Sequence, residues 1–166
     1  MSSPTLAVPS AFHAPLFASP AVSSEAREVD ELLRHGEGDR GVGYALAQDA
    51  LLNELRQLAI DCSVPDWDGH GARPIDDRSV YLASLFIAGL PLFTPLPEIG
   101  VDPDGEVSLD WHVRARHSLS ISIGGDGSLA YAALFGTSRM RGVEVIDGGV
   151  PETIMAALHR LFPRTG

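Results

Sequence analysis

Residues 107–123 have the sequence VSLDWHVRARHSLSISI, in which apolar and polar side chains alternate. Apolar residues occupy one phase of the pattern: Val107, Leu109, Trp111, Leu119, Ile121 and Ile123. Polar residues occupy the other phase: Ser108, Asp110, His112, Ser118, Ser120 and Ser122. A period of two is typical of antiparallel strands that have one covered face and one open face. The stretch therefore predicts two half-buried strands.

The same period continues on both sides of this stretch. We expect a leading strand over 98–101, a continuation through Leu129 and Tyr131, and a further strand that includes Val143 and Val145. Asp-Gly pairs at 104–105 and 126–127 separate the runs, and hairpin turns favour residues that accept a positive φ. The pattern predicts an antiparallel meander of four or five strands.

Helical periodicity flanks the meander. A short helical pattern begins near Ser24, and we expect Gly36 to end it before a flexible link and a second helix over 44–60. A third helix should follow Pro74, with Asp76 as its N-cap and Gly89 at its end. Pro151 and the apolar residues at 154, 158 and 161 predict a closing helix.

The predicted fold class is α+β. It has two or three N-terminal helices, an antiparallel meander of four or five strands, and a C-terminal helix, with the helices on one sheet face. Residues 1–43 are expected to form a disordered or partly helical tail and linker, and residues 44–163 a single α+β domain.

Composition excludes several classes of function. The 166 residues carry a formal charge of −10, which argues against binding to nucleic acid or to an anionic membrane. All 12 basic residues are arginines, so no mechanism can use a lysine Schiff base or a phosphate-loop lysine. Cys62 is the only cysteine, which excludes an intrachain disulfide and fits a reducing compartment. We expect a cytoplasmic protein.

The most distinctive loop is PDWDGHGARP at residues 65–74. Asp66, Asp68 and His70 are metal-ligand types, but a structural zinc site normally has four ligands, mostly Cys or His. We favour a second interpretation, in which Asp68 accepts bonds from backbone N–H groups while Gly69 and Gly71 permit the turn.

Two further side chains of this loop have alternative roles. Trp67 could pack in the core, with its indole N–H on a loop carbonyl, or form an exposed contact for a partner. Arg73 could bind a carboxylate or phosphate of a partner, although pairing with Asp66 or Asp68 is the commoner arrangement.

The loop and a second segment together resemble parts of known sequences. WDGHGARPI at 67–75 and DGEVSLDW at 104–111 are similar to segments of a group of small bacterial proteins. Those proteins share a W-D-G-x-G-A-x-P-I segment, a helix, a Pro-rich step and a D-G-x-[IV]-x-L-x-W strand. The resemblance covers residues 60–162 and implies a bacterial origin and an intact domain, but no assigned activity. It also implies an aromatic residue in the relatives where His70 stands and an acid where Asp110 stands, so His70 is not expected to be an essential acid–base group or metal ligand.

The serine-bearing phase of the strands predicts a flat, open face. Asp110 and His112 should point to this face, where an acid–base pocket would need a lid. Arg139 and Arg141 are expected in a wide hairpin turn, with an anion site as the alternative. No Gly-x-Ser-x-Gly elbow is present, so no serine is assigned as a nucleophile. A flat face of small residues suits contact with another protein or a second copy.

These observations favour a non-enzymatic protein-interaction module of a bacterial cytoplasm, which neutralises or regulates a partner protein. The expected partner is another protein, for which a basic one fits best, or a second copy of this chain. Neither nucleic acid nor a membrane is expected as a partner. No catalytic residue, cofactor or metal is assigned. The candidate interaction or ligand residues are Trp67, Asp68, His70, Arg73, Asp110 and His112. The alternatives are a metal-assisted hydrolase that uses the 66–70 loop and a sensor of a small anionic ligand.

Overall fold

The computed structural model describes residues 24–92, 94–147 and 149–163, with side chains from Gly38 onward. The chain divides into two units, Met1–Gly38 and Asp39–Gly166, and the second contains the whole sheet. The expected disorder of residues 1–23 lies outside the described residues.

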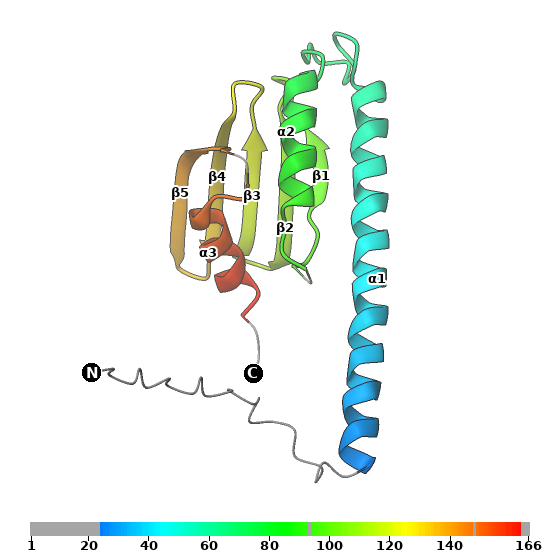
Figure 1. The fold of residues 1–166 in the computed structure, drawn as a ribbon. Coiled ribbons are helices and arrows are strands. Elements are labelled where there is room, and N and C mark those ends of the chain that lie inside the picture. The colour runs from blue at the N-terminus through cyan, green and yellow to red at the C-terminus, as the bar shows by residue number, and fades with distance from the viewer. Residues whose placement is uncertain (1–23, 93, 148, 164–166) are drawn as a thin grey trace, which may run out of the picture. The chain divides into compact units, whose positions relative to one another are not determined.

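The fold is α+β, as the sequence predicts (Figure 1). The helices are α1 (Ser24–Asp61), α2 (Asp77–Ala88) and α3 (Glu152–Leu161). The strands are β1 (Glu98–Val101), β2 (Val107–Arg114), β3 (His117–Ile123), β4 (Ser128–Phe135) and β5 (Ser138–Val145). They form one sheet in the order β1-β2-β3-β4-β5, and each strand is antiparallel to its neighbours. The meander therefore has five strands, with β1 and β5 at the edges.

The expected break between two N-terminal helices is wrong. A single helix, α1, runs through Gly36, Gly38, Gly41 and Gly43 without interruption. Glycine lowers helix propensity by about 1 kcal/mol relative to alanine, but unlike proline it keeps its backbone N–H donor. The glycines therefore weaken this part of α1 without ending it.

The ends of α2 and the hairpin turns match the sequence. The Asp76 carboxylate accepts the backbone N–H groups of Arg78 and Ser79, at 2.7 and 3.2 Å, and Gly89 closes the helix. Gly105 and Gly127 each have a φ of +90°, the conformation that favours glycine in hairpin turns. Residue choice at these positions therefore specifies where α2 and the hairpins begin and end.

The helices cover one face of the sheet. Helix α2 packs on β2 and β3, and α3 packs on β3 and β4 (Figure 1). The apolar phase of the strands is buried beneath them: Val107, Leu109, Trp111, Leu119, Ile121, Ile123, Leu129, Ala133 and Phe135. Leu51 and Leu55 bring the 39–61 part of α1 into the same core. Each large aliphatic side chain buried in this way contributes about 1.5–3 kcal/mol.

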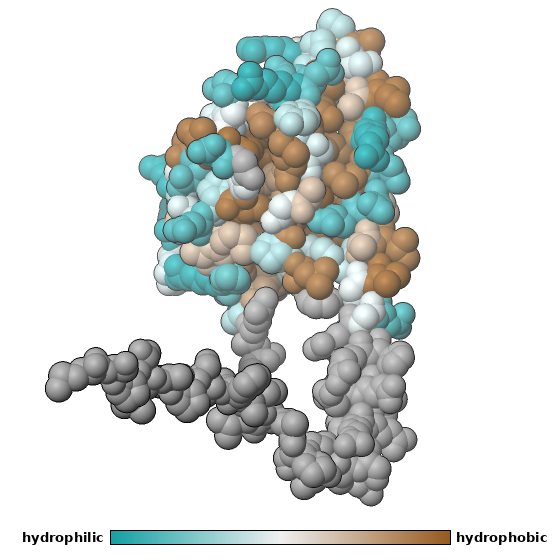
Figure 2. All heavy atoms as spheres, in the orientation of Figure 1, coloured by the Kyte–Doolittle hydropathy of each residue, from teal (hydrophilic) through white to brown (hydrophobic). Residues whose placement is uncertain are grey.

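The helix side also exposes some apolar surface. Figure 2 shows apolar residues gathered on this side of the molecule. Tyr81 and Leu85, one turn apart on α2, are both exposed.

On α3, the guanidinium of Arg160 lies 4.2 Å from the ring centroid of Phe135 on β4, which is a cation–π contact.

A buried hydroxyl joins α2 to two strands. Ser79 is fully buried, and its Oγ accepts the backbone N–H of Val107 at 2.9 Å while donating to the carbonyl of Ile123. One side chain thus bonds both to the start of β2 and to the end of β3. Because the site excludes water, both the N–H of Val107 and the carbonyl of Ile123 would lack a hydrogen-bond partner without this hydroxyl.

Strand β5 departs from the expected pattern, in which the apolar residues of each strand face the helices. Val143 and Val145 are 68% and 71% exposed, because their phase faces away from the helices. Met140 and Gly142 occupy the covered phase, and the ring of Tyr131 fills the space above Gly142. The valines correctly indicate a strand, but at this edge they lie on the open face.

Replacing Ser79 by alanine should lower the free energy of unfolding by about 1–3 kcal/mol, because the N–H of Val107 and the carbonyl of Ile123 lose their buried partner. Urea denaturation followed by circular dichroism measures the change. Ser84→Ala is the matched control, since that hydroxyl bonds only to a carbonyl of its own helix, and it should cost under about 0.5 kcal/mol. Equal losses in the two variants would contradict this role of Ser79.

Candidate functional site

The candidate site is the sheet face opposite the helices, which we call the open face. None of the described elements of unit Asp39–Gly166 packs over it. Strand register arranges its residues in rows that cross the sheet. The central row is Glu98, Asp110, Ser120, Ala132 and Arg141, and a neighbouring row is Gly100, Ser108, Ser122, Ala130 and Val143. Serine and alanine in the middle of the rows keep the face low.

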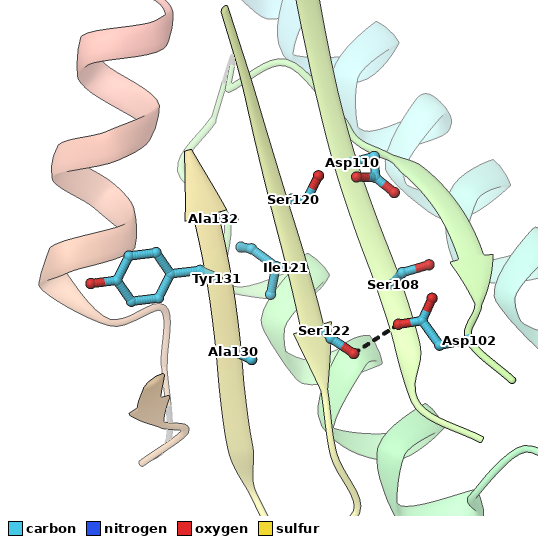
Figure 3. A pocket seen from close by; sticks show the side chains of 9 residues that line it. All are labelled: Asp102, Ser108, Asp110, Ser120, Ile121, Ser122, Ala130, Tyr131 and Ala132. Atoms are coloured by element: carbon cyan, nitrogen blue, oxygen red, sulfur yellow. Dashed lines mark hydrogen bonds between the residues drawn. The ribbon is translucent and has the colours of Figure 1, made fainter. Parts of the chain in front are cut away.

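A shallow depression of about 420 Å³ lies over the middle of this face (Figure 3). Its lining residues are Asp102, Ser108, Asp110, Ser120, Ile121, Ser122, Ala130, Tyr131 and Ala132. Most of them belong to the serine and alanine phase of β2, β3 and β4. The depression therefore arises because short side chains sit side by side on three neighbouring strands.

One end of the depression is acidic. The Oγ of Ser122 lies 2.9 Å from Oδ2 of Asp102 and 2.6 Å from Oε2 of Glu106, and Figure 3 shows the first contact as a dashed line. A hydroxyl has one hydrogen, so it donates to one carboxylate at a time. Glu98 and Asp110 face each other across β1 and β2, which places two further negative charges close together. The β1–β2 side of the open face is therefore strongly negative.

The opposite side of the open face is basic. Arg139 and Arg141 lie on β5 itself, so their expected place in a wide turn is wrong. They are two residues apart on one strand and share the open face. Both are exposed, and neither forms an ion pair with any residue that the structure describes. Acidic and basic edges thus flank a nearly neutral centre.

Asp110 and His112 lie on the open face, as strand parity predicts. Asp110 is half-buried beside Ser120, whereas His112 is exposed next to the register shift that separates it from Arg114. Only Asp110 lines the depression. The two residues therefore do not form an acid–base pair in a pocket.

The Trp67 loop is held together by its own carboxylates. Oδ1 of Asp68 accepts the N–H groups of His70 and Ala72, at 2.8 and 3.1 Å, and Oδ1 of Asp66 accepts that of Gly71 at 2.6 Å. Gly69 and Gly71 have positive φ, and Asp66 shares this conformation at +62°. These bonds match the interpretation of Asp68 as a partner for backbone groups.

The other side chains of the loop have separate surroundings. Trp67 is half-buried against the core and donates its indole N–H to the carbonyl of Arg73 at 2.9 Å. His70 and Arg73 are exposed, and the expected pairing of Arg73 with a loop aspartate is absent among the described residues. Backbone bonds from Arg73 to Pro103 and from Asp76 to Gly105 fasten the loop to the β1–β2 turn.

The structure does not unite the six candidate residues. None of the four candidates on the loop lines the depression that contains Asp110. Within the described part of the chain, no three His, Cys, Asp or Glu side chains are placed to hold a metal ion. The residues that sequence reasoning missed are Asp102, Glu106, Ala130 and Ala132. Strand register groups Ala130 and Ala132, and the Ser122 hydroxyl brings Asp102 and Glu106 together.

Asp68 should make stability depend on pH. The N–H groups of His70 and Ala72 hold the pKa of the Asp68 carboxyl below its ordinary value of 3.8. A lowered folded-state pKa contributes stability above the unfolded pKa, and this contribution is lost as pH falls through the folded value. Unfolding by urea, compared at neutral pH and at about pH 3, should show a smaller acid-induced loss for Asp68→Asn than for the unmodified protein.

Asp126 offers an independent check, because bonds from Ser128 lower its pKa in the same way. Asp126→Asn should reduce the acid-induced loss as well. Curves for Asp68→Asn that parallel those of the unmodified protein would show that the carboxylate does not stabilise the loop.

Cys62 should react slowly with thiol reagents in the folded protein. Burial, and to a smaller extent the charge of Asp61, raises the pKa of its thiol, and the side chain is only 5% exposed. Reaction with Ellman's reagent should be at least about tenfold slower than in urea, because the thiolate is the reactive form. A variant with an added, exposed thiol, Val64→Cys, should show one fast and one slow thiol. Two fast thiols would contradict the buried position of Cys62.

Comparison with known proteins gives no relative. No family model, no curated protein and no solved structure matches the chain. None of the helices in the described segments is both long and apolar enough to cross a bilayer. The resemblance of the 67–75 and 104–111 segments to small bacterial proteins stays a prediction.

Proposed function

We propose that this chain is a non-enzymatic interaction module of the bacterial cytoplasm whose open face binds a protein, either another protein that it neutralises or regulates or a second copy of itself. The observation that carries the proposal is the low face bounded by unpaired charges. A covered sheet face has buried apolar side chains, whereas this one has exposed Ser120, Ala130 and Ala132. Small side chains let a partner surface approach closely without displacing long flexible groups.

The charges favour a protein as the partner. Carboxylates on β1 and β2 suit basic groups, and the two arginines on β5 suit acidic groups. A partner that matches both edges needs to span the whole sheet, which is wider than a small molecule. Five strands at about 4.8 Å spacing place the edges about 19 Å apart. Electrostatic matching over such a width gives specificity and orientation.

The Trp67 loop supports this function indirectly. Oδ1 of Asp66, Oδ1 of Asp68 and the indole N–H of Trp67 already bond within the loop. The loop in turn holds the β1–β2 turn in place. We therefore assign the loop a positioning role, in which it fixes the acidic edge of the open face.

A bulky charge at the centre of the open face should abolish partner binding. Ala132 lies on the open face, whereas Ala156 is exposed on α3, so Ala132→Arg and Ala156→Arg form a matched pair. Affinity purification from the native host, quantified by mass spectrometry, should recover a stoichiometric protein with the unmodified chain and with Ala156→Arg. That protein should be depleted at least about tenfold with Ala132→Arg. The proposed function is wrong if no co-purified protein, counting untagged copies of the chain itself, is depleted with Ala132→Arg.

A further inference from the structure

We propose that the partner of the open face is a second copy of this chain, packed face to face about a two-fold axis that runs along β3. This inference rests on the proposed function, because it names the occupant of the same surface. It follows from how charge and side-chain size are distributed across the register rows.

The first argument is unpaired charge. In the central row, Glu98 and Asp110 face each other on β1 and β2, and like charges in directly opposed positions destabilise a sheet. The cation of this row, Arg141, lies on β5, about 14 Å from β2 at a strand spacing of about 4.8 Å. No ion pair within the described residues neutralises any of the three. Neither edge therefore has a countercharge from the described residues of its own chain.

The second argument is the direction of the axis. A two-fold axis parallel to β3 places β1 of one copy over β5 of the other, and β2 over β4, because β3 is the middle strand. Arg141 then lies over Glu98 of the second copy, with Asp110 one strand further in, and the same contact occurs twice. An in-plane axis perpendicular to the strands would place β1 over β1 and acid over acid. The charge distribution thus selects one of the two arrangements.

The third argument is side-chain size. The exposed aliphatic residues of the face, Leu134, Val143 and Val145, all lie on β4 and β5. The β1–β2 side of the row that contains Val143 has only Gly100 and Ser108. The axis along β3 places Val143 over this low part of the second copy. Packed sheets lie about 10 Å apart with interdigitating side chains, so a tall residue is best placed opposite a short one.

The area is sufficient for association. The five strands have 4, 8, 7, 8 and 8 residues. At a strand spacing of about 4.8 Å and a rise of about 3.4 Å per residue, they give a face of roughly 570 Å² in projection. Standard protein interfaces bury about 800 Å² of accessible surface on each partner, and accessible area exceeds projected area. The face is thus of the size that stable, specific complexes use.

A rival surface exists on the helix side, where Tyr81 and Leu85 are exposed on α2. It lacks the opposed acidic and basic edges that select an orientation. Leu85→Arg therefore serves as the control that separates association through the helices from association through the sheet.

The test uses charge reversal on the full-length purified chain. The unmodified protein and Leu85→Arg should sediment as concentration-dependent dimers, and Ala132→Arg as a monomer. Glu98→Arg alone and Arg141→Asp alone should each raise the dimer Kd by about tenfold or more, because each puts like charges directly across the interface. Circular dichroism and thermal unfolding establish that each variant is folded.

Two rescue experiments give the decisive results. The double variant Glu98→Arg/Arg141→Asp should recover dimer formation, since each new charge meets its new opposite on the second copy. An equimolar mixture of the two single variants should form heterodimers, because at positions 98 and 141 one chain then has two negative groups and the other has two positive groups. Sedimentation velocity with one variant labelled by a fluorophore measures this recovery.

The outcomes separate this inference from the proposed function. A monomer at every concentration overturns the second-copy inference, and so does a dimer disrupted by Leu85→Arg or insensitive to Ala132→Arg. Failure of both rescue experiments overturns the axis along β3. If the purified chain is a monomer but a different host protein is lost with Ala132→Arg, the proposed function stands and only the second copy is excluded.

Discussion

The alternation of side chains along β2 and β3 is the constraint on which the rest of the structure depends. A strand turns successive residues to opposite faces, so a single run specifies both what α2 and α3 cover and what remains open. A shift of one residue in register would expose Leu109 and Ile121 and bury Asp110. Ser79 reinforces this choice, because its hydroxyl bonds to the start of β2 and to the end of β3.

Local residue chemistry explains why much of the fold could be predicted. An N-cap such as Asp76, a turn glycine such as Gly105 and a period-two run each act over a few residues, and sequence displays them directly. The uninterrupted α1 was missed because glycine is a weak breaker, and the cost of Gly36 or Gly41 is small enough for a long helix to bear. The exposed Val143 was missed because β-branched residues favour strands whichever face they occupy.

The candidate site was only partly predictable, for a physical reason. Sequence drew attention to the Trp67 loop because it concentrates chemically distinctive residues, yet most of that chemistry is used internally by Asp66, Asp68 and the indole N–H. Asp110 was identified through its strand phase. Glu98 and Arg141, by contrast, are separated by 43 residues in the chain, and their shared row exists only once four strand pairs have a register. Charge across a sheet is a tertiary property, which local patterns do not encode.

The edges of the sheet give the molecule a further property. Strand β1 has only four residues and follows Pro97, which has no N–H to donate, while Arg139 and Arg141 lie along β5. Short, proline-flanked and charged edges resist the addition of a further strand from another chain. Growth by backbone pairing, the route to fibrils, is therefore disfavoured at both ends. The proposed face-to-face contact uses the same surface of both copies, so it closes at two chains and leaves no open end for further growth.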